Sequence, residues 1–476
     1  MVFSSPVFLF LFLPLVLLAT FLAGGLKARN TVLLIASLLF YTWGEGTYLV
    51  LMLSVTLVNY LCGLAVGRFR DRRLWLTLAV VANIGTLVWF KYANFLVGSL
   101  DPLLQQLGLP VLVLDPVHLP IGISFFIFHG LSYVIDVYRG DAKAQANPNL
   151  VTLYITFFPQ LIAGPILRYH DIADQLTDRT TDIARFASGI RRFVIGVAKK
   201  VLLADQVARI ADGIFDADPD TLPPSVAWLG LVAYAMQIYF DFSGYSDMAI
   251  GLGRMFGFEF MENFRRPYIS RSIREFWQRW HISLSTWFRD YLYIPLGGNR
   301  LGAGRTYVNL FAVFLLTGLW HGASWNFVVW GLIHGLFLVI ERMGLGRVLD
   351  RLPTALSNAY AVLVVLLAWV FFRETDITAA WHFTLSLFGG VSGDPVLHHA
   401  SLYLSHTTLL ALVIAVLGAL DVHTRIAGML RLAPEGKHLP GGWRGSFEVA
   451  GLGLLLLLVG MHIASTTFSP FIYFRF

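Results

Sequence analysis

The chain contains little of what soluble enzymes commonly use. Among its 476 residues there is one cysteine, and charged residues make up 13%, against about 25% in soluble domains. Cys62 therefore cannot form an intrachain disulfide, and its apolar neighbours give no reason for a reactive thiolate. A Walker A loop, a G-x-S-x-G elbow, an H-E-x-x-H pair and a cysteine metal cluster are also missing from the sequence. These absences argue against a cysteine acyl-enzyme, a metal site and the common soluble hydrolases.

Apolar residues are abundant instead. They make up 57% of the chain, which includes 38 phenylalanines and 13 tryptophans. Apolar runs that are long enough to span a bilayer, or short enough to tilt or re-enter, recur at 5–25, 31–43, 47–67, 74–98, 119–138, 149–166, 225–256, 307–342, 355–372, 402–420 and 447–464. The pattern predicts an all-α membrane protein with roughly eleven transmembrane or re-entrant helices. The run 307–342 is expected to be broken or paired.

Basic residues predict the orientation of the chain. The segment "GRFRDRR" belongs in the cytoplasm by the positive-inside rule, which places Glu45 outside and Lys27 with Arg29 inside. No internal repeat stands out. We therefore expect one polytopic domain over 1–476, with N-terminal helices at 1–118, a core at 119–342 and C-terminal helices at 343–476.

Two polar segments interrupt the apolar pattern. The segment 168–200 mixes charges with apolar residues at helical spacing, as an interfacial helix does. The segment 263–300 carries seven arginines against two acidic residues, interleaved with aromatic residues. It can be a positive-inside anchor with a tryptophan belt, a site for anionic lipid head groups, or a site for a phosphate-bearing donor. The donor-binding candidates are Arg265, Arg266, Arg271, Arg274, Arg279 and Trp280.

Two histidines lie in the apolar stretch "TGLWHGASWNFVVWGLIHG", which ends at Gly335. An ionisable side chain near the bilayer centre costs at least about 2.5–3.5 kcal/mol, so such side chains usually face the protein interior or water. For His321, a structural hydrogen bond and a positioned general base are both open. In one continuous helix, His334 would be turned about 220° from His321 and lifted about 20 Å. We therefore expect the two histidines in different places, with His334 in a packing role.

Two further motifs place polar groups among apolar residues. In "YFDFSGYSDMAIG", helical spacing puts Tyr239, Ser243 and Asp247 on one stripe and Asp241 on another face. A polar lumen and an ordinary helix end are both compatible with this pattern. In "FFPQLIAGPILRY", Gln160 stands beside prolines that break or kink a helix. Broken helices at membrane depth are tolerated where they line a cavity.

Several motifs together resemble a known family. They are "MVFSSPVFLFLFLP", "FFPQLIAGPILRY", "YFDFSGYSDMAIGLGRMFGFEFMENFRRPY", "EFWQRWHISLSTWFRDYLYIPLGGNR" and "LWHGASWNFVVWGLIHG". The resemblance is to the membrane-bound O-acyltransferase family, in its bacterial branch of alginate O-acetyltransferase-like proteins. It is densest at 119–342, while the segment 373–446 matches no motif. It implies helices around a central tunnel, a cytoplasmic acyl donor and two family histidines at His281 and His321, with His321 catalytic.

The resemblance also implies a reaction. Acetyl-CoA, or an acyl carrier thioester, is the expected donor substrate, no cofactor is expected to be bound, and the acceptor is a hydroxyl of an exported polysaccharide such as alginate, cellulose or peptidoglycan. His321 would take the proton of that hydroxyl, while His281 orients the donor or supports the oxyanion. Asn299 or Asn326 could donate a hydrogen bond there. The expected tunnel-lining or supporting residues are Gln160, Tyr239, Asp241, Ser243, Asp247, Asn299, Trp320, Ser324 and Asn326.

The location and the partners follow from the same expectation. The protein would be a multi-pass protein of the bacterial inner membrane, in contact with the lipid bilayer. Because acetyl-CoA is inside and the polysaccharide outside, an extracytoplasmic acetyltransferase partner is expected, and nucleic acid is not. The alternative is a transporter or proton-coupled flippase in which buried His and Asp relay protons, and the absence of paired repeats weighs against it.

Overall fold

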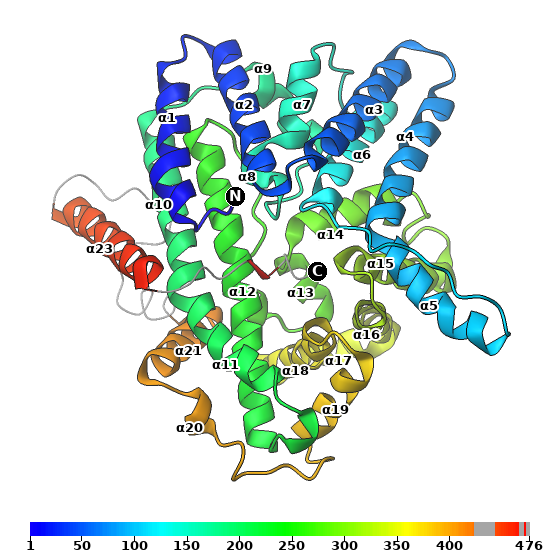
Figure 1. The fold of residues 1–476 in the computed structure, drawn as a ribbon, viewed down its shortest axis with the longest axis vertical. Helices are drawn as coiled ribbons and strands as arrows, with labels where there is room; N and C mark the ends of the chain where they lie inside the picture. Colours follow the sequence, from blue (N-terminus) through cyan, green and yellow to red (C-terminus); the bar gives the residue numbers. More distant parts are fainter. Residues whose placement is uncertain (423–442, 466–470, 473–476) are drawn as a thin grey trace. The chain divides into compact units, whose positions relative to one another are not determined.

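The computed structural model describes residues 1–422, 443–465 and 471–472, and every regular element in these ranges is a helix. The prediction of an all-α protein is thereby confirmed for the described residues (Figure 1). The described chain divides into two compact units: unit 1 comprises Met1–Ile190 and Ala249–Met261, and unit 2 comprises Arg191–Met248 and the described residues from Glu262 onward. The expected single domain over 1–476, with its three segments, stays a prediction.

Unit 1 contains the N-terminal helices. They are η1 (Phe8–Phe12), α1 (Leu13–Leu22), α2 (Leu26–Glu45), α3 (Tyr48–Arg68), α4 (Arg72–Leu87), η2 (Val88–Tyr92), α5 (Ala93–Gln106), α6 (Ile123–Arg139), α7 (Pro148–Thr156), α8 (Phe158–Leu161), α9 (Tyr169–Thr177) and the first half of α10 (Ile183–Ala198). Helix α3 packs against both α4 and α6 (Figure 1). A Cβ on Gly63 would lie 2.2 Å from the Tyr133 ring, so only glycine permits this close packing.

Unit 2 contains the histidine motifs. Its elements are the rest of α10, η3 (Lys199–Ala204), α11 (Asp205–Phe215), η4 (Pro219–Thr221), most of α12 (Pro224–Met255), η5 (Pro267–Ile269), α13 (Ile273–Arg279), α14 (Ile282–Phe288), η6 (Arg289–Tyr293), α15 (Gly302–His321), α16 (Trp325–Ile340), η7 (Glu341–Leu345), α17 (Gly346–Leu349), α18 (Thr354–Arg373), α19 (Ile377–Leu387), α20 (Ala400–Tyr403), α21 (His406–Ala419) and α23 (Trp443–Ser465). The polar segment 168–200 is helical, as predicted, and divides into α9, α10 and the start of η3.

Six helices among the described residues are long and apolar enough to cross a membrane. They are Tyr48–Arg68, Arg72–Gln106, Pro224–Met255, Trp325–Leu349, Thr354–Arg373 and Gly445–Ser465. Two shorter apolar helices lie at Phe8–Leu22 and His406–Ala419. The protein is therefore a multi-pass helical membrane protein, whereas the expected number of eleven membrane elements is not confirmed.

Two sequence alternatives are settled by helix boundaries. Helix α12 is unbroken from Pro224 to Met255, so Asp241 and Asp247 lie inside a helix and not at its end. In the proline-containing motif, α7 ends at Thr156 and α8 has four residues, so this helix is broken as predicted.

Candidate active site

The stretch 317–335 forms a helical hairpin. Helix α15 ends at His321, the chain turns through Gly322–Ser324, and α16 begins at Trp325. A Cβ on Gly318 would lie 2.2 Å from the carbonyl oxygen of Phe327, so the two helices pack backbone to backbone. The expectation of a broken or paired run at 307–342 is confirmed.

The hairpin corrects the predicted separation of the two histidines. Because the chain reverses direction, the calculation for one continuous helix does not apply. The ring centroid of Trp330 lies 4.9 Å from that of His321 and 5.0 Å from that of His334, so both histidines contact one indole. His334 is fully buried, and its Nδ1 accepts a hydrogen bond from the Trp277 indole N–H at 3.3 Å.

His281 lies at a second helix break. It separates α13 from α14 with a φ of 44°, a left-handed conformation that is uncommon for a non-glycine residue. Its ring centroid lies 6.4 Å from that of His321. The structure thus brings together the two histidines that the family resemblance singled out, each at the end of a helix.

Aromatic rings surround both histidines. Trp320, Trp330 and Phe372 place their ring centroids 4.9–5.1 Å from that of His321. Phe242 lies edge-on to His281 at 4.7 Å. Such apolar surroundings strengthen electrostatic interactions and favour uncharged imidazole rings.

Two cavities of about 350 and 460 Å³ lie beside α13. They share Arg274, Arg289 and Tyr293, so they adjoin each other along these side chains. The first is mainly apolar and reaches Thr317, one helical turn before His321 on α15. The second is polar and includes Arg271, Arg342 and Asn299 together with three carboxylates. An apolar compartment next to one that contains four arginines can hold an acyl chain with a phosphate-bearing end.

The structure separates the five predicted donor arginines. Arg271 and Arg274 line the polar cavity, while Arg265, Arg266 and Arg279 line neither cavity. Arg266 pairs with Asp421 at 2.7 Å, and Arg279 pairs with Glu275 at 2.8 Å. Trp280 is buried among aromatic rings, including Phe276 and Trp369, and it also lines neither cavity.

Glu341 holds α13 in place, a role that no sequence pattern indicated. Its two carboxylate oxygens accept the backbone N–H groups of Ile273 and Arg274 at 2.6 and 3.0 Å. These are free donors at the start of α13, which a carboxylate satisfies well. Glu341 thereby fixes the backbone from which Arg274 enters both cavities.

The predicted polar stripe on α12 is an ion-pair region. Asp247 pairs with Lys199 and Arg192 at 2.6 and 2.8 Å, and Asp241 pairs with Lys200 at 3.0 Å. The carboxylates are therefore neutralised by basic residues of α10 and η3, which helical spacing within one helix could not reveal. Asp241 also accepts the backbone N–H of Ile472 at 2.7 Å.

The other expected supporting residues are dispersed. Tyr239 packs against Trp280, and Ser243 is buried on α12. Asn299 accepts the hydroxyl of Tyr293 within the polar cavity. The Asn326 amide donates one hydrogen bond to the backbone carbonyl of Glu374 at 2.6 Å. Ser324 directly precedes α16, and Trp320 lies beside His321. Gln160 donates a hydrogen bond to the Tyr154 carbonyl within unit 1.

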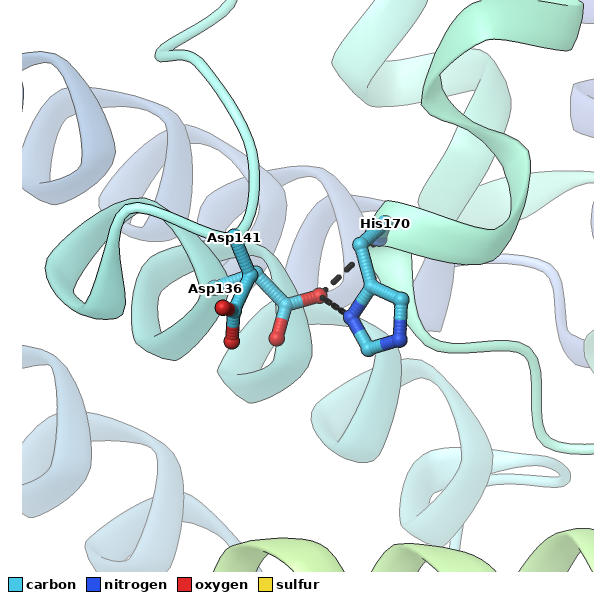
Figure 2. Close-up of side chains that lie close together, drawn as sticks. All are labelled: Asp136, Asp141 and His170. Carbon is cyan, nitrogen blue, oxygen red and sulfur yellow. Dashed lines mark hydrogen bonds and ion pairs between the residues drawn. The ribbon is translucent and has the colours of Figure 1, made fainter.

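One group in unit 1 has the composition of a metal site. Figure 2 shows Asp136, Asp141 and His170, whose ligand atoms lie within 4.8 Å of one another. One oxygen of Asp136 accepts both the backbone N–H and Nδ1–H of His170, each at 2.9 Å. The hydrogen bond to Asp136 raises the pKa of His170, which favours an imidazolium. We interpret the group as an ion pair that caps α9.

These features define a class: a helical membrane protein with two buried histidines at adjacent helix breaks, and an apolar cavity lined by Ile282 and Thr317, which lie one residue and one helical turn from them along the chain. A family model described as "MBOAT, membrane-bound O-acyltransferase family" matches residues 38–374. The "Probable alginate O-acetylase AlgI" of Azotobacter vinelandii is 45% identical over 505 aligned residues, which cover 100% of both chains. The protein of the same name from Pseudomonas aeruginosa is 50% identical over 392 residues, covering 82% of this chain and 75% of its own. The "Peptidoglycan O-acetyltransferase" of Helicobacter pylori is 33% identical, covering 100% and 98%.

The chain belongs to the membrane-bound O-acyltransferase family, as the sequence motifs predicted. It is an enzyme, an O-acyltransferase, which decides against the transporter alternative.

Proposed function

We propose that the enzyme takes an acetyl group from a cytoplasmic thioester and passes it across the inner membrane for O-acetylation of an exported polysaccharide. The observation that carries this proposal is the approach of His281 and His321 to 6.4 Å between aromatic rings, with an apolar cavity that reaches Thr317, one helical turn before His321. The names of the relatives support acetyl transfer to alginate or peptidoglycan.

The donor lies in the two cavities beside α13. Its phosphate groups face Arg271, Arg274, Arg289 and Arg342, because guanidinium groups match phosphate geometry. The thioester arm follows the apolar cavity toward Thr317 and the adjacent His321. Acetyl-CoA and an acyl carrier thioester share this chemistry.

The chemical step is an acyl transfer to a hydroxyl. His321 takes the proton of the acceptor hydroxyl, the oxygen attacks the thioester carbonyl, the C–O bond forms and the C–S bond breaks. The proton then passes from the imidazolium to the departing thiolate. A central tunnel connects the two sides, and an extracytoplasmic partner protein completes the transfer to the polymer.

The replacement His321→Ala tests the proposal. We expect a folded, membrane-inserted protein with no measurable acetyl transfer, because general-base catalysis contributes about 10²- to 10⁴-fold and the buried ring has no substitute. Purified wild type and variant are incubated with labelled acetyl-CoA or a labelled acyl carrier protein, with and without the extracytoplasmic partner. Label transfer by the variant at wild-type rates would contradict the role of His321.

The replacement Arg274→Gln tests the donor site. The replacement should raise the KM for the thioester more than it lowers kcat. The difference in KM between wild type and variant should decrease at higher salt, because salt screens exposed phosphate contacts. Arg279→Gln, outside both cavities, should change KM less. The exposed Arg347, which lines neither cavity, provides the matched control Arg347→Gln. Equal changes in KM for Arg274→Gln and the control would contradict this donor site.

A further inference from the structure

Asn263 connects α12 with the chain at His281 and Ser283. Its side-chain Oδ1 lies 3.1 Å from the backbone nitrogen of Ser283, 2.9 Å from the Ser283 hydroxyl and 3.2 Å from Nδ1 of His281. Both Asn263 and His281 are 0% exposed, so water does not compete for these hydrogen bonds. On the other side, Asn263 Nδ2 donates to the hydroxyl of Ser246 on α12 at 3.1 Å.

The orientation of the Asn263 amide follows from a donor that cannot change. The backbone N–H of Ser283 can only donate, so the Asn263 atom facing it must be the oxygen. The same oxygen faces Nδ1 of His281, and two lone pairs facing each other at 3.2 Å would repel. The Ser283 hydroxyl also lies 3.4 Å from Nδ1, but its proton is donated to the closer Asn263 oxygen at 2.9 Å. The proton of the neutral imidazole therefore lies on Nδ1 and is donated to Asn263.

The other ring nitrogen then has no proton. Nε2 of His281 is buried and has no hydrogen-bond partner among the described residues. A buried acceptor without a partner costs about 1–3 kcal/mol. The left-handed backbone of His281 adds conformational strain in the same residue. Costs of this kind are concentrated at functional sites, where a ligand group completes the hydrogen bond.

We propose that Asn263 is a positioning residue that fixes His281 as the Nδ1–H tautomer, so that Nε2 accepts a hydrogen bond from an O–H or N–H group of a bound substrate. This inference rests on the proposed function, because it gives His281 a place in that reaction. Of the two roles expected for His281, it selects orientation of a substrate. Stabilisation of the oxyanion needs a donor, and a neutral Nε2 without a proton cannot supply one.

Substitutions at Asn263 separate positioning from folding. Asn263→Leu removes the acceptor and should lower kcat by at least about 10-fold, because His281 in the other tautomer no longer orients the substrate, and a misplaced reacting group can cost about 10²-fold. Asn263→Asp keeps the acceptor but adds a charge that favours the imidazolium. Its activity should be low at neutral pH and recover at higher pH, which shifts the acid limb of the kcat/KM profile upward. The control is Asn309→Leu, since the buried Asn309 amide bonds only backbone carbonyls and should leave the profile unshifted.

A spectroscopic measurement tests the tautomer without activity. Solid-state NMR of protein labelled with ¹⁵N-histidine, as the difference between wild type and His281→Ala, should show an Nδ1-protonated ring. An Nε2-protonated ring would overturn the inference, as would full activity and an unshifted pH profile in both Asn263 variants. If instead His281→Ala transfers acetyl groups normally while NMR shows the Nδ1–H tautomer, the proposed place of His281 in the reaction fails and the positioning by Asn263 stands.

Discussion

His170 in unit 1 and His281 in unit 2 have similar hydrogen bonds and different chemical surroundings. In each case Nδ1 faces a side-chain oxygen that also accepts a backbone N–H: Asp136 Oδ2 for His170 and Asn263 Oδ1 for His281. The first acceptor is a carboxylate and the second an amide. His170 is also 30% exposed, whereas His281 is fully buried. The same local geometry therefore stabilises a charged ring in one unit and a neutral ring in the other.

The difference teaches that hydrogen-bond geometry alone does not identify a catalytic histidine. The charge of the acceptor determines whether the ring holds its proton, and burial determines whether the second nitrogen meets water or substrate. His170 has a second carboxylate, Asp171, 3.4 Å from Nε2. Nε2 of His281 has no partner among the described residues. The first arrangement is an ion pair, and the second leaves a nitrogen available to a substrate.

The largest effect should come from removing the neutral ring. His281→Ala is expected to lower kcat by about 10²-fold or more while the protein stays folded, because Nε2 has no replacement and loss of substrate positioning can cost about 10²-fold. Labelled acetyl transfer by equal amounts of monodisperse wild type and variant measures this. His170→Ala provides the matched histidine control, and equal losses in both variants would remove the functional distinction between the two rings.

A smaller effect should come from neutralising the carboxylate of the other pair. Asp136→Asn is expected to lower the free energy of unfolding by about 1.5–3 kcal/mol at pH 6, the usual range for a hydrogen bond to a charged group. The raised pKa of His170 means that the ion pair contributes fully below the unfolded pKa of about 6.5 and is lost as pH rises through the folded pKa. The loss in the variant should therefore be smaller at pH 8.5. Denaturant unfolding in detergent at both pH values measures it, and equal losses would show that the charge of His170 does not change between them, against the prediction.

The smallest effect should be that of His170→Gln on catalysis. Because His170 lies in the first turn of α9, where it pairs with Asp136, and lines neither cavity, kcat and KM per folded molecule should stay within about twofold of wild type, as expected of a site outside the reaction. The pH dependence of stability should decrease at the same time. Steady-state kinetics on material separated by size-exclusion chromatography measure the first, and a large change in kcat alone would contradict the assignment of His170 as structural.

The sequence by itself determined the class of the protein and much of its site. Its low charge and long apolar runs require a helical membrane protein, because only such helices satisfy their backbone hydrogen bonds in lipid. Its motifs identified the family and pointed to His281 and His321, whose rings the structure brings together. Glycine spacing around His321 indicated close helix packing, which the contact of Gly318 with Phe327 confirms.

Tertiary structure alone decided which groups meet. The reversal after His321 placed His334 against the same indole, where helical geometry had separated them. Arg289 and Arg342 lie with Arg274 at the polar cavity. Glu341 accepts the backbone N–H groups of Arg274 and Ile273, which precede it by 67 and 68 residues. Asn263, 18 residues before His281, faces its ring only because α13 and the turn before α14 bring the chain back. Residue spacing along a helix predicts only which side chains are neighbours on that helix. The charge and tautomer of a buried ring depend on atoms from other segments of the chain.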